Sequence, residues 1–205
     1  MNKITNAQHG AVSELINAGK LLYAKGWVPA TSGNFSIRLN SDNIAITVSG
    51  KDKGFLTPDD IMTINSRGEP LDNKKPSAET GLHVALYKQF PDINAILHTH
   101  SINATLISRL NDDELNLCGY ELLKAFHGIN THETSLCVPI FANDQDIARL
   151  SQKVVRYLDK NPLIYGYLIA GHGLYTWGRS MQETIRHLEA FEFIFECELK
   201  LKGAR

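Results

Sequence analysis

The spacing of apolar residues along the chain predicts a series of helices separated by loops and short strands. Apolar residues recur every three or four positions from Val12 to Leu22, and Gly26 follows them, so we expect an amphipathic helix that ends before this glycine. Ser77 is a suitable N-cap for a second helix. The predicted helices cover residues 7–25, 78–89, 101–109, 120–127, 143–158 and 180–200.

Short runs rich in apolar and β-branched residues lie between these helices and predict strands. The runs "NFSIRL" and "NIAITV" are joined by the polar "NSD", which is typical of a β-hairpin. The predicted strands cover residues 34–39, 43–48, 61–65, 93–99, 135–140 and 163–171. Because a meander of strands is combined with helices before, between and after it, the pattern predicts one α/β domain over residues 1–205. Helices should flank a central, largely antiparallel β-sheet.

Composition and charge exclude several classes of protein. Hydrophobic residues make up 43% of the 205 residues and charged residues 21%, a balance typical of a globular protein. The formal net charge is −1 and no long run carries one sign, so we expect no nucleic-acid partner and no membrane partner. No apolar stretch reaches the roughly 18 residues of a membrane span. The three cysteines are widely spaced, which favours a reducing compartment, and we expect a cytoplasmic protein.

Two histidines in the segment "LHTHS" are the first candidates for chemistry. If this segment is a strand, His98 and His100 point to the same side, because side chains alternate along a strand. Two imidazoles placed in this way can bind one divalent metal ion and supply two of the three protein ligands of a catalytic zinc site. On the spacing alone, one buried core histidine and one exposed histidine would explain the pattern at least as well.

Two further segments favour the metal site. In "AGHGLYTWG", His172 follows an apolar strand and stands between two glycines, which let backbone and metal come close together. In "KPSAETGLH", Glu79 falls in the first turn of a predicted helix, where the helix dipole favours a carboxylate. Without a metal it would be an ordinary helix N-terminal charge. His83 follows one turn later and is either a partner of this site or a core or surface residue.

Two glycine-containing loops in the first third of the chain could bind an anion. One is "ATSGNFS" and the other is "VSGKDKG"; both expose backbone amides, and together they offer hydroxyl groups and a lysine. Ser-Gly-Asn is also ordinary turn chemistry, so each loop alone indicates little. The residues that could cradle a phosphate are Thr31, Ser32, Gly33, Asn34, Ser49, Gly50, Lys51 and Ser77.

Four segments in register resemble the class II aldolase/epimerase family, which includes the adducin head. They are "ATSGNFSIRL", "VSGKDKGFLTPDD", "KPSAETGLHVALYKQFPDINAILHTHS" and "GHGLYTWG", and they extend the resemblance over nearly the whole chain. The resemblance implies a three-layer α/β/α fold, a homotetramer, and a small sugar-phosphate substrate. It implies one Zn²⁺ per subunit held by His98, His100 and His172. It also places Glu79 beside the metal as a ligand or acid/base.

Shorter stretches resemble a dehydratase branch of that family. These are "SGKDKG", "GYELLKAF" and "RHLEAFEFIFECEL", and the second of them has Glu121 where the dehydratases carry a catalytic acid/base. From the residues alone, a glutamate in an amphipathic helix is usually a solvated charge. The resemblance therefore implies a metal-dependent lyase with Glu121, or alternatively Glu79, as the acid/base. The alternatives are an aldolase or 4-epimerase on the same zinc site, and an adducin-like interaction module, in which the metal histidines are expected to be missing.

Overall fold

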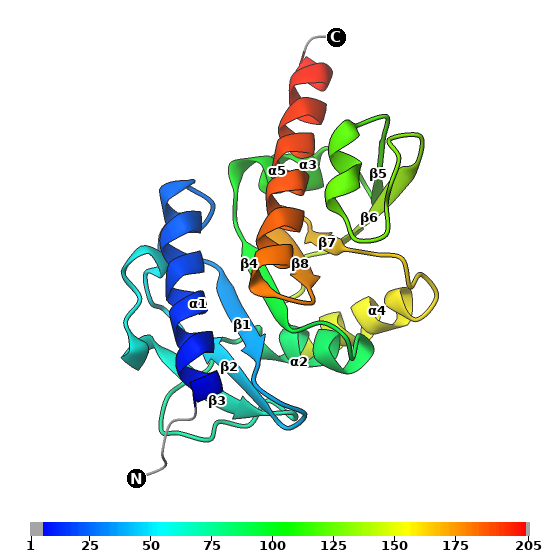
Figure 1. Ribbon diagram of the computed structural model, residues 1–205. Coiled ribbons are helices and arrows are strands. Elements are labelled where there is room, and N and C mark those ends of the chain that lie inside the picture. Colours follow the sequence, from blue (N-terminus) through cyan, green and yellow to red (C-terminus); the bar gives the residue numbers. More distant parts are fainter. Residues whose placement is uncertain (1–5, 204–205) are drawn as a thin grey trace.

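In the computed structural model, which describes residues 6–203, the chain folds around one eight-stranded sheet (Figure 1). The α-helices are α1 (Asn6–Ala24), α2 (Thr80–Gln89), α3 (Ile102–Arg109), α4 (Ile147–Leu158) and α5 (Met181–Gly203). The strands are β1 (Asn34–Arg38), β2 (Asn43–Thr47), β3 (Ile61–Asn65), β4 (Ala95–Thr99), β5 (Glu114–Cys118), β6 (Ser135–Phe141), β7 (Gly166–Ile169) and β8 (Gly173–Gly178). Three short 3-10 helices are η1 (Lys53–Phe55), η2 (Pro58–Asp60) and η3 (Glu121–Ala125).

The sheet has the strand order β3-β2-β1-β4-β8-β7-β6-β5. Every neighbouring pair is antiparallel except β6 and β7, which are parallel, so the predicted largely antiparallel sheet is confirmed. In the centre of the sheet, Asn34 of β1 pairs with His98 of β4, and His98 pairs on its other side with Tyr175 of β8. This register places the loop before β1 directly beside the "LHTHS" segment.

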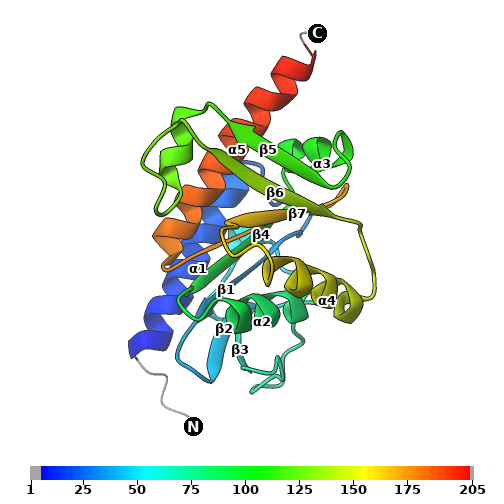
Figure 2. The ribbon, with the colours of Figure 1, turned by 90° about the vertical axis from the view of Figure 1, so that its right-hand side faces the viewer.

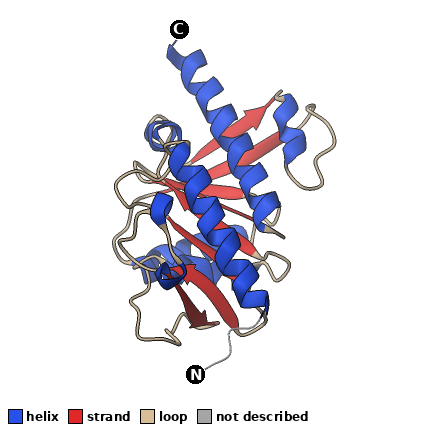
Figure 3. Cartoon of the chain, turned by 60° about the vertical axis from the view of Figure 1, so that its left-hand side comes forward, coloured by secondary structure: helices blue, strands red, loops and turns tan. Residues whose placement is uncertain are grey.

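Helices cover both faces of the sheet, as the predicted three-layer α/β/α arrangement requires (Figures 2 and 3). On one face α1, α3 and α5 pack through buried residues such as Leu15, Ile107 and Phe191. On the other face α2 and α4 pack through residues such as Leu86 and Val154. Each helix buries one apolar stripe against the strands, which is the main source of stability for such a layer. None of the helices in the described part of the chain is long and apolar enough to cross a membrane.

Several segments differ from the sequence prediction, most clearly those around η3 and β8. The predicted helix 120–127 is only the five-residue 3-10 helix η3, and the preceding residues "ELNLC" form the edge strand β5. Only Leu115 and Leu117 of β5 are buried, so the strand has too few alternating apolar residues to be predicted from the sequence. The predicted strand 163–171 is confined to β7, and a further strand, β8, follows the turn at His172. β8 was not predicted because it begins and ends with a glycine, a residue that is typical of loops.

Candidate metal centre

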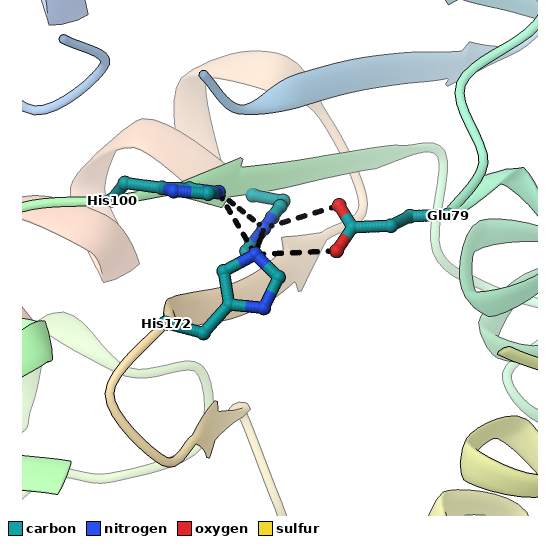
Figure 4. A group of neighbouring side chains, drawn as sticks. Glu79, His100 and His172 are labelled. Atoms are coloured by element: carbon teal, nitrogen blue, oxygen red, sulfur yellow. Dashed lines mark hydrogen bonds and ion pairs between the residues drawn. The ribbon is translucent and has the colours of Figure 1, made fainter. Parts of the chain in front are cut away.

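Four side chains from distant parts of the chain converge at one point (Figure 4). His98 lies in β4, His100 follows that strand, His172 lies in the turn between β7 and β8, and Glu79 is the residue before α2. The Nε2 atoms of His98 and His100 are 2.9 Å apart, those of His100 and His172 are 3.1 Å apart, and those of His98 and His172 are 3.3 Å apart. The two carboxylate oxygens of Glu79 lie 3.3 Å from Nε2 of His98 and 3.3 Å from Nε2 of His172.

This arrangement suits a divalent metal ion. Ligands about 2.0–2.1 Å from a tetrahedral ion lie about 3.3 Å from one another, close to the separations of the three imidazole nitrogens. The Nδ1 atom of His98 donates to the carbonyl oxygen of Leu174 at 3.0 Å, so its Nε2 atom presents a lone pair to the cluster. Because His98 has no proton on Nε2, the three mutual contacts of the Nε2 atoms cannot all be hydrogen bonds at once, whereas a cation between the atoms satisfies all three. The donor set therefore fits a metal better than it fits a hydrogen-bonded histidine cluster.

The surroundings keep the imidazoles neutral, which is the form that binds metals. Burial, together with neighbouring His100 and His172, holds the pKa of His98 well below its usual value. Burial, His172 and the ammonium of Lys53 lower the pKa of His100 to about 4. Both side chains are therefore uncharged near pH 7. The ring of His98 also stacks on the ring of Tyr175, with 3.9 Å between the ring centres, which fixes its orientation.

Two glycines allow the close approach that brings the ligands together. A Cβ atom on Gly173 would lie 2.0 Å from the carbonyl oxygen of Thr99, so no other residue lets β8 come this close to β4. A Cβ atom on Gly33, whose φ is +75°, would lie 2.6 Å from the carbonyl oxygen of His98. The backbone of the loop before β1 therefore lies directly against the strand that carries the histidines.

A buried chain of hydrogen bonds leads to the carboxylate of Glu79. The side-chain nitrogen of Asn34 donates to Glu79 at 2.7 Å, and the Asn34 oxygen accepts from Nε2 of His83. Nδ1 of His83 in turn accepts from the hydroxyl of Ser36 at 2.7 Å, and Ser36 is bonded to the hydroxyl of Tyr87. His83 is fully buried, and burial lowers its pKa to about 3. Of the alternatives for His83, the structure favours a partner of the site.

Replacing His83 with leucine is expected to lower turnover by about ten- to a hundredfold while the metal stays bound, because Asn34 loses the group that orients it toward Glu79. Turnover and metal content of the purified variant give the result. The matched control is His187→Leu, since His187 is buried but bonded to the carbonyl oxygen of Trp177. An unchanged rate in His83→Leu would show that these hydrogen bonds do not control the orientation of the Glu79 carboxylate.

A cleft of about 320 Å³ extends from the four-residue cluster. Glu79, His100 and His172 of the cluster line it. The rest of its wall includes seven of the eight residues predicted to cradle a phosphate: Thr31, Ser32, Gly33, Asn34, Ser49, Gly50 and Ser77. The segment 143–145 between β6 and α4 also lines the cleft, although its sequence predicts the start of a helix. The polar residues of this segment are typical of a helix N-terminus, and nothing else in the sequence indicates that they line a cleft.

Two predicted site residues lie outside this cleft. Lys51 does not line it, and its Nζ atom forms an ion pair with Asp60 at 2.8 Å. Glu121 does not line it either: its side chain is 70% exposed and pairs with Lys124 at 2.5 Å and with His132 at 3.5 Å. The hydrogen bond and charge of Lys124 lower the pKa of Glu121, so this carboxylate is ionised near pH 7. Within one chain, the structure therefore brings Glu79 to the histidines and leaves Glu121 apart.

Comparison with known proteins supports the fold and the family resemblance of the sequence. The chain is 56% identical over 192 residues to methylthioribulose-1-phosphate dehydratase of Pseudomonas savastanoi pv. phaseolicola, a match that covers 93% of this chain and 94% of that protein. It is 51% identical over 193 residues to the dehydratase of the same name from Methylococcus capsulatus, covering 94% and 95%. An L-fuculose-1-phosphate aldolase from Thermus thermophilus has the same fold, with a TM-score of 0.77, 22% identity, and 96% and 98% of the two chains covered. Residues 13–199 match the family described as Class II Aldolase and Adducin N-terminal domain, and the chain therefore belongs to that family.

Proposed function

We propose that this protein is a zinc-dependent lyase that converts 5-methylthioribulose 1-phosphate to 5-methylthio-2,3-dioxopentyl 1-phosphate and water, a step of methionine salvage. The observation that carries the proposal is a three-histidine cluster beside a cleft whose lining is rich in hydroxyl and amide groups. The similarity to dehydratases at 51–56% identity over more than nine-tenths of the chain supports the choice of reaction.

The cleft matches the two ends of a sugar phosphate. Oxygen atoms of the sugar would lie at the histidine end, and the phosphate would lie among the amides and hydroxyls of residues 31–34, 49–50 and 77. Holding both ends fixes the reacting carbons relative to the catalytic groups, which by itself accelerates a reaction. A binding module has no need of the histidine cluster, and the presence of all three histidines argues against the adducin-like alternative.

We assign the metal to His98, His100 and His172, with Glu79 beside it. Three imidazole nitrogens and a carboxylate suit Zn²⁺ and also Fe²⁺, Mn²⁺ or Co²⁺. A bound ion of this kind supplies Lewis-acid polarisation of substrate oxygens, which makes the proton on C3 more acidic. The chain supplies the proton transfers: a carboxylate removes the C3 proton, and a carboxylic acid protonates the departing C4 hydroxyl, which leaves as water. The enol that remains tautomerises to the diketone.

Glu121 is our leading candidate for this base and acid, and Glu79 is the alternative. Because Glu121 is exposed and lies outside the cleft of its own chain, it would have to act in the cleft of a neighbouring subunit. An exposed apolar stripe on α3 and its C-cap supports assembly: Ile102, Leu106 and the C-cap residue Leu110 are 73%, 47% and 57% exposed and recur every four residues. We propose a homotetramer in which a neighbour covers this stripe.

Replacing Leu106 with glutamate is expected to dissociate the tetramer, because it puts a charge in the middle of the stripe. Light scattering on the purified variant measures the mass. Leu163→Glu is the control, since Leu163 is 79% exposed but lies outside α3. A Leu106→Glu variant with the mass of the wild type would show that the stripe is not part of the interface.

We also propose a cytoplasmic location. Cys118, Cys137 and Cys197 are all free thiols, and such a set is typical of a reducing compartment. Fractionation of the native cells, followed by detection of the protein in the soluble extract, tests this part of the proposal.

A substrate panel tests the reaction itself. The metal-loaded protein is incubated separately with 5-methylthioribulose 1-phosphate and with fuculose 1-phosphate. Formation of the diketone phosphate from the first compound, with no dihydroxyacetone phosphate from the second, is the expected result. Release of dihydroxyacetone phosphate would instead identify an aldolase, and formation of the C4 epimer of a sugar phosphate would identify an epimerase.

A further inference from the structure

A buried lysine joins the two loops that line the anion end of the cleft. Lys53 begins η1 and is 1% exposed. Its Nζ atom donates to the carbonyl oxygen of Thr31 at 3.1 Å and to the carbonyl oxygen of Lys51 at 2.6 Å. The first acceptor lies in the loop 30–33 and the second in the loop 49–52. One ammonium group therefore connects both loops, which we call the first and second cleft loops.

The first cleft loop has a backbone that needs such support. Ala30 and Thr31 have φ values of +52° and +62°, in the left-handed region that residues with a Cβ atom rarely adopt. The conformation is least favourable for a β-branched residue such as Thr31, and it persists only where surrounding contacts hold it. The hydrogen bond from Lys53 to the Thr31 carbonyl is a contact of this kind.

The backbone of Lys53 is itself held in place by α1. A Cβ atom on Gly19 would lie 2.2 Å from the carbonyl oxygen of Lys53, so only a glycine lets the helix come this close to η1. The side chain of Lys53 then extends from this fixed point toward the two loops. This packing distinguishes it from Lys51, whose exposed amine pairs with Asp60.

The ammonium of Lys53 forms no ion pair with a carboxylate of the described residues 6–203, and Asp52 acts on it only through its more distant charge. A buried charge is costly unless a partner compensates it. An ammonium has three donors, and the two loop carbonyls account for two of them. Thr31, whose carbonyl oxygen accepts a hydrogen bond from this ammonium, lines the cleft. An anion in the cleft would therefore lie within the field of this cation.

We propose that Lys53 is the positioning residue for the phosphate end of the cleft. It holds the two cleft loops in their binding geometry through their carbonyl oxygens, and its charge stabilises a phosphate bound above them. The identity of the substrate rests on the proposed function, but the role of Lys53 in phosphate binding is measurable without turnover.

The experiment compares Lys53→Gln, Lys53→Met and the control Lys88→Met, which replaces an exposed lysine near the end of α2 that does not line the cleft. Calorimetry gives the Kd of inorganic phosphate for each metal-loaded protein, and circular dichroism confirms the fold. We expect the Kd to rise about tenfold or more in both Lys53 variants and to stay within about twofold in Lys88→Met. With the sugar phosphate, KM should rise more than kcat falls. Lys53→Gln keeps a donor for the loop carbonyls, so it remains informative if Lys53→Met does not fold.

A folded Lys53→Gln variant that binds phosphate as tightly as the wild type would overturn the inference. A wild-type protein that does not bind inorganic phosphate at all would overturn it as well. Phosphate binding that depends on Lys53, in a protein that does not dehydrate 5-methylthioribulose 1-phosphate, would support the inference and contradict only the proposed function.

Discussion

Replacing His100 with alanine is expected to release the metal and to lower turnover of 5-methylthioribulose 1-phosphate by about a thousandfold or more. His100 contributes one of three converging Nε2 atoms, and two imidazoles hold an ion far less tightly than three. It is a better test than His98, whose ring is fully buried and stacked on Tyr175, because replacing His98 would also remove core packing. Metal analysis and initial rates on the same preparation give both results.

The matched control for this substitution is His9→Ala. His9 is an exposed residue of α1 and does not line the cleft. This variant should keep its metal and its rate. A His100→Ala variant that retains a full equivalent of metal and turns over normally would remove His100 from the ligand set and leave the cluster without its proposed role.

Replacing Glu121 and Glu79 separately with glutamine is expected to give two different defects. Glu121→Gln should lower turnover by about 10²–10⁴-fold with the metal retained, because it removes a proton-transfer group and no ligand. Glu79→Gln should lower metal content together with turnover, because its carboxylate lies 3.3 Å from two of the imidazole nitrogens. Glu133→Gln, another exposed glutamate, is the control. Rates and metal content of all three variants separate the two roles.

Normal turnover in Glu121→Gln combined with a dead, metal-loaded Glu79→Gln variant would move the acid/base role to Glu79. It would also weaken the choice of a dehydratase. If Glu121 does act across a subunit interface, co-expressed His100→Ala and Glu121→Gln chains should form mixed oligomers that regain activity. In such oligomers, some clefts combine an intact His100 from one chain with an intact Glu121 from the other.

The helices and turns that could be predicted are those whose sequence patterns lie within a few neighbouring residues. The apolar spacing of α1, α4 and α5 and the "NSD" turn between β1 and β2 each lie within a few residues, so they are visible without the rest of the fold. β8 was missed because its terminal glycines are explained only by its neighbours: Gly173 by the backbone at Thr99, and Gly178 by the backbone at Thr184. Edge strand β5 has too few apolar residues to stand out.

The candidate site shows the same division. His98, His100 and His172 could be grouped from their spacing and their glycines, although the meeting of their nitrogens depends on the pairing of β4 with β8. The sequence favoured Lys51 of "GKDKG" over Lys53 as a phosphate-binding residue. Only the contact of η1 with α1 decides that Lys53 is buried and Lys51 is exposed. Residues 143–145 lie in the connection between the parallel strands β6 and β7, and this connection places them beside the cleft. No local sequence pattern predicts that placement.

Removing and restoring the metal tests most directly whether a metal held by three histidines performs the chemistry of this protein. A chelator strips the purified protein, zinc is added back in measured amounts, and formation of the diketone phosphate from 5-methylthioribulose 1-phosphate is followed at each step. Turnover should disappear on stripping and return in proportion to zinc, with saturation at one equivalent per chain. Full turnover by the stripped protein would contradict the account.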